Sequence, residues 1–136
     1  MEKVLDDCKI ALACMGGVLG WLFGGFDSLI YALIAFVALD YVTGVLLAIR
    51  EKKVSSEIGF HGICKKVMIF ALVTLGHVID QYVIGSGSSL RTMLIMFYLS
   101  NEGISIIKNA SEMGVPVPDK LKGILQQLNK NSSKKE

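Results

Sequence analysis

Residues 28–49 read SLIYALIAFVALDYVTGVLLAI, and this stretch decides the fold because Asp40 is its one charged residue. A helix rises about 1.5 Å per residue and the hydrocarbon core of a bilayer is about 30 Å thick, so about 20 apolar residues can cross it. A buried helix of a soluble protein would need polar positions at helical spacing, and residues 29–39 offer only Tyr31. The stretch therefore predicts a membrane-spanning helix.

Three further apolar stretches occupy most of the remaining chain, at residues 10–26, 67–84 and 90–107. We expect an all-α integral membrane protein of one domain, with residues 1–9 as a cytoplasmic N-terminus and a transmembrane domain at 10–107. Four spans are favoured. In the three-span alternative, the glycine-rich first stretch lies in or on the membrane, because glycine weakens helix propensity. A signal peptide is disfavoured, since Gly25-Phe26-Asp27 is a poor cleavage site.

Basic residues gather in two segments, one connection and the C-terminal tail, and these determine the expected orientation in the membrane. The first group lies between the second and third apolar stretches and consists of Arg50, Lys52, Lys53, Lys65 and Lys66. The second group lies in the tail from Lys108 onward, whereas the connections around Asp27 and at 85–90 contain no basic residue. By the positive-inside rule, both basic segments and the C-terminus should be cytoplasmic. The sequence thus predicts a multi-pass protein.

The tail at 108–136 has a character of its own. Gly114-Val115-Pro116-Val117-Pro118 cannot continue a helix, because proline lacks an N–H and restricts the residue before it. Beyond it, apolar side chains recur at i, i+3, i+4 and i+7, at Leu121, Ile124, Leu125 and Leu128. This spacing predicts a short amphipathic helix at about 118–128, lying on the inner leaflet. Residues 129–136 are polar and basic, and we expect them to be disordered.

Small residues form two rows at helical spacing. Gly16, Gly20 and Gly24 follow one another every four residues in the first stretch, and Gly44 and Ala48 do so in the second. In lipid, such rows let helix backbones approach closely and so favour association. We interpret them as surfaces for self-association, with the bilayer as the other partner.

Polar side chains inside the apolar stretches are the candidates for function. A carboxylate near mid-span costs about 2.5–3.5 kcal/mol on insertion scales, so Asp40 should face protein or water. Either it lines an aqueous path, or it pairs with a neighbouring helix and holds the fold, with His77, Asp80 and Gln81 as candidate partners. The fourth stretch adds a polar stripe at helical spacing. Its members are Asn101, Ser105, Lys108 and Asn109, with Glu102 beside it.

No residue pattern points to catalysis or to a bound metal. Cys8, Cys14 and Cys64 are odd in number, and one of them lies within a predicted span, which disfavours a disulfide framework. His61 and His77 each stand alone on their segments. We expect no catalytic residue, metal, cofactor or nucleic-acid partner, and no enzymatic activity.

Four motifs in a fixed order resemble those of a known family. They are Asp40-x-x-Thr43-Gly44, then Ser55-Ser56 with Gly59-x-x-Gly62-x-x-Lys65-Lys66, then Asn101-Glu102-x-x-Ser105-Ile106-x-x-Asn109, and then Gly114-Val115-Pro116-x-Pro118 with Leu121. Together they resemble the phage lysis and toxin secretion holins of Gram-positive bacteria and their phages. Lys108 departs from the pattern, where an acidic residue would be expected, so a specific ion pair at that position is in doubt.

The resemblance implies a protein of the bacterial cytoplasmic membrane that accumulates and then assembles into lesions. Its cargo would be a murein hydrolase (endolysin) or a toxin. Two other classes stay open. A small ion channel or transporter subunit would concentrate Asp40, His77, Asp80 and Glu102 along a narrow path. An intramembrane enzyme is the least favoured, because no nucleophile motif or metal-ligand pair supports one.

Overall fold

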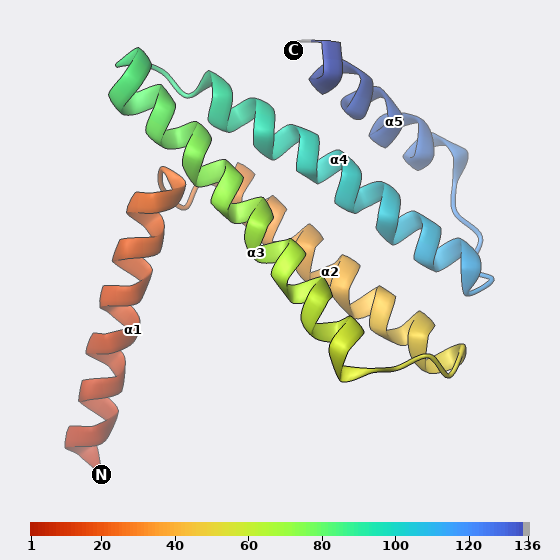
Figure 1. The fold of residues 1–136 in the computed structure, drawn as a ribbon, viewed down its shortest axis with the longest axis horizontal. Coiled ribbons are helices and arrows are strands. Elements are labelled where there is room, and N and C mark those ends of the chain that lie inside the picture. Colours follow the sequence, from red (N-terminus) through yellow and green to blue (C-terminus); the bar gives the residue numbers. More distant parts are fainter. Residues whose placement is uncertain (135–136) are drawn as a thin grey trace.

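The computed structural model describes the backbone of residues 1–134 and the side chains of residues 1–131. Within those residues the regular structure is entirely helical, which confirms the all-α part of the expected fold class (Figure 1). The elements in chain order are α1 (Glu2–Phe23), α2 (Ser28–Arg50), α3 (Ser56–Val78), the π-helical segment η1 (Ile79–Ile84), α4 (Ser89–Glu112) and α5 (Asp119–Lys134).

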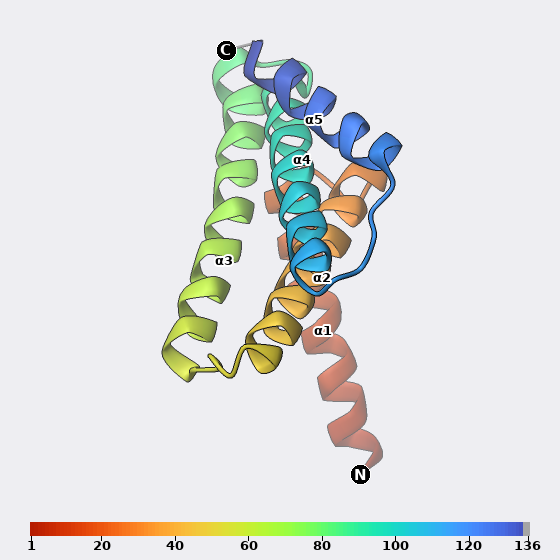
Figure 2. The ribbon, with the colours of Figure 1, turned by 90° about the vertical axis from the view of Figure 1, so that its right-hand side faces the viewer.

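Helices α2, α3 and α4 pack side by side around one apolar core (Figures 1 and 2). From α2, the spacing of Ile30, Leu33 and Val37 places three side chains on one face, and all three are buried. The other helices complete the core with Ile69 and Val73 from α3 and Ile95 and Leu99 from α4. Many outward side chains of α2 and α3 are apolar and exposed, among them Ile34, Leu46 and Met68. These three helices therefore form the body that positions the polar residues.

Side-chain caps fix where α2 and α3 begin. The Asp27 carboxylate accepts a hydrogen bond of 3.0 Å from the backbone N–H of Ile30, and the Ser55 hydroxyl accepts one of 3.2 Å from that of Ile58. Both satisfy N–H groups that have no partner within a first helical turn. The third helix consequently starts well before residue 67, the expected start of the third span.

Helix α1 splays away from the other helices, as Figure 1 shows. Along α1, all of which the structure describes, no side chain is buried. It joins the body only near its C-terminal end, where the rings of Phe23 and Phe70 lie 5.4 Å apart between centroids. The helix ends at Gly24 and Gly25, whose φ angles of 80° and 102° suit glycine. Its bounds differ from the expected 10–26 because these glycines stop it early and the charged N-terminal residues are helical.

Helix α5 folds back along α4 instead of leaving the bundle (Figure 2). Leu125 is buried against α4 at Gly103, where a β-carbon would lie 2.9 Å from Leu125 Cδ2. The expectation of disorder from residue 129 is wrong as far as Lys134, because α5 continues to that residue, and Leu128 and Asn131 border a groove with the first turns of α4. Residues 135–136 lie outside the described part of the chain.

Two helical segments are long and apolar enough to cross a membrane, Ser28–Arg50 and Ser56–Ile84. Only 11% and 17% of their most apolar windows are buried inside the protein, whereas the core helix of a soluble protein is mostly buried. Their apolar surface is therefore available to lipid. Among the described helices, α1 and α4 do not reach this combination of length and hydropathy, and their crossing stays a prediction.

Candidate functional site: charged clusters within an apolar bundle

Three charged side chains from three helices meet inside the bundle. The ammonium of Lys66 on α3 donates hydrogen bonds to Oδ2 of Asp40 on α2 and to Oε2 of Glu102 on α4. The side chains retain 18%, 11% and 9% of their exposure, respectively. We call Asp40, Lys66 and Glu102 the inner triad. One ammonium shared by two carboxylates ties all three helices together.

A second layer of hydrogen bonds supports Asp40. The Asn109 side chain of α4 donates through Nδ2 to Thr43 Oγ1 at 2.9 Å and to Asp40 Oδ1 at 3.4 Å. The Thr43 hydroxyl in turn donates to the Leu39 carbonyl at 2.8 Å. Both carboxylate oxygens of Asp40 thus have partners, as buried charge requires. These contacts favour the structural interpretation of Asp40 within one copy of the chain.

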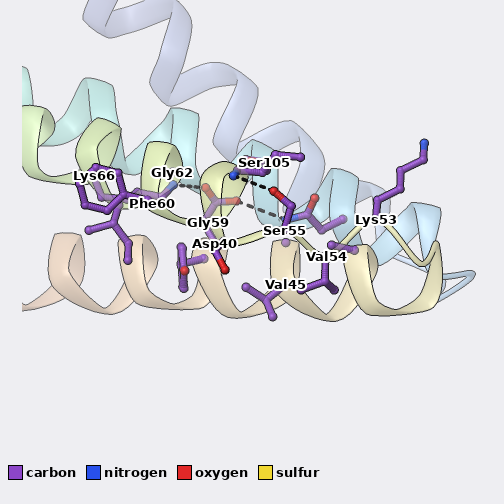
Figure 3. A pocket seen from close by; sticks show the side chains of 17 residues that line it. Asp40, Val45, Lys53, Val54, Ser55, Gly59, Phe60, Gly62, Lys66 and Ser105 are labelled. Carbon is purple, nitrogen blue, oxygen red and sulfur yellow. Dashed lines mark hydrogen bonds and ion pairs between the residues drawn. The ribbon is translucent and has the colours of Figure 1, made fainter.

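A cavity of 630 Å³ lies between α2, α3 and α4, with Asp40, Lys66 and Ser105 in its wall (Figure 3). Asp40 and Lys66 add charge to its wall, but most of its lining is apolar. On one side the Tyr41 ring covers two glycines of α3: a β-carbon at Gly59 would lie 3.4 Å from the Tyr41 hydroxyl oxygen. Since one water takes about 30 Å³ of liquid volume, the space is large enough for several waters. Two members of the inner triad, Asp40 and Lys66, therefore border a space that water can occupy.

A second cluster lies at the opposite end of the bundle and centres on Arg91 of α4. Its guanidinium donates to both Asp27 carboxylate oxygens, at 2.8 and 3.0 Å, and to the backbone carbonyls of Phe23 and Gly25. Arg91 is only 3% exposed. A bidentate pair of this kind is among the stronger hydrogen-bonded contacts in proteins. It fixes the turn between α1 and α2 to the start of α4.

Asp80 of η1 completes this outer cluster, which we define as Asp27, Asp80 and Arg91. Its carboxylate accepts hydrogen bonds from the backbone N–H groups of Leu90 at 3.2 Å and Arg91 at 3.0 Å, so it caps the start of α4. The hydrogen bond from Arg91 is the largest cause that lowers the pKa of Asp27 below its ordinary value of 3.8. Asp27 is therefore ionised at neutral pH.

The prediction that His77, Asp80 and Gln81 are partners of Asp40 is wrong. His77 and Asp80 lie at the outer end, where His77 Nδ1 would be 2.6 Å from a β-carbon at Gly24, and Gln81 donates to the Gly87 carbonyl at 3.0 Å. The reason is register. Because α2 and α3 run antiparallel, the start of α2 is level with the end of α3, and Asp40 is level with Lys66.

The five basic residues expected on the connection between the second and third spans do not all lie on that connection. Arg50, Lys52 and Lys53 lie exposed near the α2–α3 turn, and the Arg50 guanidinium donates to the Glu112 carbonyl at 2.8 Å. Lys65 is exposed on α3. Lys66 does not belong to a connection, because Ser55 starts α3 early enough to turn this side chain inward to the triad.

The two rows of small residues have different surroundings. Gly16 has open space around its α-carbon, whereas a β-carbon at Gly20 would lie 3.1 Å from the Phe26 ring. Gly24 is not part of the helical row, because it is the left-handed residue that ends α1. Gly44 and Ala48 line the cavity of their own chain. The role of either row in self-association stays a prediction.

Two features of the site escaped the sequence analysis. Arg91 was not among the candidate residues. It carries the opposite charge to Asp27, and the two residues lie at the starts of two apolar stretches, 90–107 and 28–49, that should begin at the same membrane face. Asn109 was assigned to the polar stripe but not to Asp40. On that stripe Glu102 joins the triad, Ser105 lines the cavity and Asn101 is half-buried.

Taken together, apolar helices with exposed surfaces and enclosed charge clusters define a small helical membrane protein. The family model of the bacteriophage holin family matches residues 17–130, and the chain belongs to that family.

Several bacterial relatives are similar over nearly their whole length. An uncharacterised 14.9 kDa protein from the nagH 3' region of Clostridium perfringens is 37% identical over 95% of this chain and 98% of its own. An uncharacterised protein of Listeria innocua is 39% identical over 100% and 94%, respectively. YtkC of Bacillus subtilis is 32% identical over 92% of each chain. No solved structure is significantly similar to this chain.

Proposed function

We propose that this protein is a holin, which associates with copies of itself in the bacterial cytoplasmic membrane and opens lesions there. Through these lesions a murein hydrolase or a toxin would reach the cell wall. Membership of the bacteriophage holin family, over residues 17–130, is the observation that carries this proposal. The proposal gives the chain no enzymatic activity, cofactor or nucleic-acid partner.

The proposed topology has four crossings with both termini in the cytoplasm. Arg50, Lys52 and Lys53 would remain inside, in accord with the positive-inside rule. Arg91 would lie at the outer end, and its pairing with Asp27 explains how a basic residue is tolerated there. Helix α1 splays so that its N-terminus lies away from the outer cluster (Figure 1), as a first crossing from the cytoplasm would require.

The inner triad gives this proposal a physical mechanism. An unpaired charge at mid-membrane is costly, so pairing Lys66 with Asp40 and Glu102 lets single copies persist in lipid. When copies associate, the helices can exchange contacts within one chain for contacts between chains. The triad and the adjoining cavity would then face water in the lesion, and the charged groups would line it.

The test is controlled expression in a bacterium together with a cytoplasmic murein hydrolase. We expect an abrupt loss of membrane potential followed by lysis that depends on the hydrolase. Expression of the holin candidate alone should stop growth without rapid lysis. Cells that tolerate abundant inserted protein and keep their membrane potential would contradict the proposal.

A small ion channel or transporter subunit is the second candidate, because the cavity connects the surface of the bundle with charged side chains. The same experiment separates the two functions. A channel would depolarise the cell without releasing the hydrolase, since a folded enzyme does not pass a narrow path.

A further inference from the structure

Helix α5 covers one side of α4 through an apolar contact at a glycine. Leu125 is 7% exposed and occupies the notch at Gly103, where a β-carbon would lie 2.9 Å from Leu125 Cδ2 and 3.2 Å from Cε2 of Phe36 on α2. Nearer the start of α4, Leu128 borders a groove that Met93 and Met96 also line. The covered side of α4 thus includes the notch at Gly103 and the apolar side chains of Met93 and Met96.

The outward side of α5 has a different chemistry. Leu121 and Ile124 are 45% and 48% exposed, although both are apolar. Exposed lysines flank them, at positions 120, 122 and 130, and Asp119 is the one acidic residue between 119 and 131. Apolar side chains bordered by several cations are what an anionic bilayer surface binds.

This docked position conflicts with a membrane crossing by α4. Twenty-four residues of α4 span about 36 Å, close to the thickness of the bilayer core, and α5 lies against its middle at Gly103. If α4 crossed the bilayer with α5 in place, the lysines of α5 would be held beside hydrocarbon. A lysine held there is costly, because hydrocarbon cannot solvate its ammonium group. A docked α5 and a crossing α4 therefore exclude each other.

We propose that α5 is a removable cover, which leaves α4 and binds the anionic surface of the membrane when α4 enters the bilayer. This inference rests on the crossing of α4 in the proposed function and does not depend on lesion formation. The freed side of α4, around Met93, Met96 and Gly103, then becomes available to lipid or to another copy.

The test uses the full chain in vesicles of either phosphatidylglycerol or phosphatidylcholine. Cys8, Cys14 and Cys64 are free and exposed, so they can be replaced by serine, and Gln127→Cys carries a polarity-sensitive dye. We expect blue-shifted emission in the anionic vesicles only. The shift should be lost when Lys120, Lys122 and Lys130 become Gln, and kept in the control in which Lys3, Lys52 and Lys53 become Gln.

Two adjacent substitutions separate docking from membrane binding. Leu125→Ala should weaken the contact with α4 and enlarge the shift, whereas Ile124→Ala should reduce it. Emission that is equal in the two vesicles, or that depends on protein density instead of lipid charge, would overturn the proposal. Measuring vesicle leakage in the same samples keeps it distinct from the holin proposal. A lysine-dependent shift without leakage would support the proposal that α5 is a removable cover but not the holin proposal. Leakage without the shift would contradict the proposal about α5.

Discussion

At the scale of single residues, Lys66 determines whether the charges in the bundle are tolerated. It contacts two carboxylates from two other helices, and its side chain is 18% exposed. Removing one partner of a buried ionic network leaves the remaining charge uncompensated, which costs more than the network contributes when complete. The triad is therefore more sensitive to the loss of Lys66 than to any change in the exposed lysines.

We predict that Lys66→Met destabilises the protein by about 3–5 kcal/mol, because Asp40 and Glu102 lose their shared cation. The neighbouring Lys65 is exposed, so Lys65→Met is the matched control and should leave stability nearly unchanged. Unfolding of the purified protein in detergent measures both. Equal stability of the two variants would mean that the triad does not hold the helices together.

Asp27 gives a prediction about pH. Its pKa is lowered below 3.8, chiefly by the hydrogen bond from Arg91, so ionised Asp27 stabilises the folded state. That contribution is fully present above its ordinary pKa and is lost as the pH falls through the lower pKa of the folded state.

Asp27→Asn keeps a residue that can cap α2 but removes the charge. The wild-type protein should melt at a higher temperature than this variant at neutral pH, and the difference should close as the pH falls below 3.8. Thermal unfolding in detergent from pH 7 to pH 2.5 tests this. A difference that does not change with pH would show that the charge of Asp27 contributes nothing.

At the scale of elements, the close approach of α3 and α4 depends on Gly76. A β-carbon there would lie 2.6 Å from Leu94 Cδ1 and 3.3 Å from the backbone nitrogen of Arg91. The outer cluster sits at this crossing, because Arg91 belongs to the same turn of α4. A larger residue at 76 would push α4 away from α3 and strain the pairing of Arg91 with Asp27.

We expect Gly76→Ala to cost about 1–3 kcal/mol, the usual range for overpacking in a tight interior. Gly62→Ala on the same helix serves as the control, since its β-carbon would lie 3.7 Å from the Tyr41 ring, an ordinary contact. Alanine favours a helix over glycine by about 1 kcal/mol, so this control should be neutral or stabilising. If both variants unfold alike, the crossing is looser than the structure indicates.

At the scale of the whole molecule, α1 is the helix that packs against its own chain only near its C-terminal end. Its exposed side chains and the open space at Gly16 fit a contact with another copy. Gly20 is partly covered by Phe26 and Gly24 ends the helix, so Gly16 is the position in that row left fully open.

Gly16→Leu should therefore weaken self-association about tenfold, equivalent to about 1.4 kcal/mol, without affecting insertion. Gly17 also has open space but lies off the row, and Gly17→Leu is the control. Chemical cross-linking in membranes measures the fraction of dimers and larger species. A similar loss in both variants, or in neither, would argue against the row as the contact surface.

The sequence by itself determined the helical class, the apolar character of α2 and α3, and the break before α5. These features are local: an apolar run, a capping aspartate or serine, and a Gly/Pro segment act within a few residues. The ordered motifs also placed the chain in its family. The sequence was misleading where a local pattern fitted two structures. Lys66 directly precedes the apolar stretch at 67–84 and so was expected in a connection, but α3 begins at Ser56 and already contains it.

Only the tertiary structure decided which charges meet. Lys66 lies 26 positions from Asp40 and 36 from Glu102, and Arg91 lies 64 from Asp27. Such pairs depend on the antiparallel register of the helices, and register is set by the packing of many side chains at once. The docking of α5 on Gly103 was decided in the same way. Helical periodicity shows which side of α5 is apolar, but the notch that receives Leu125 exists only when α2 and α4 are packed together.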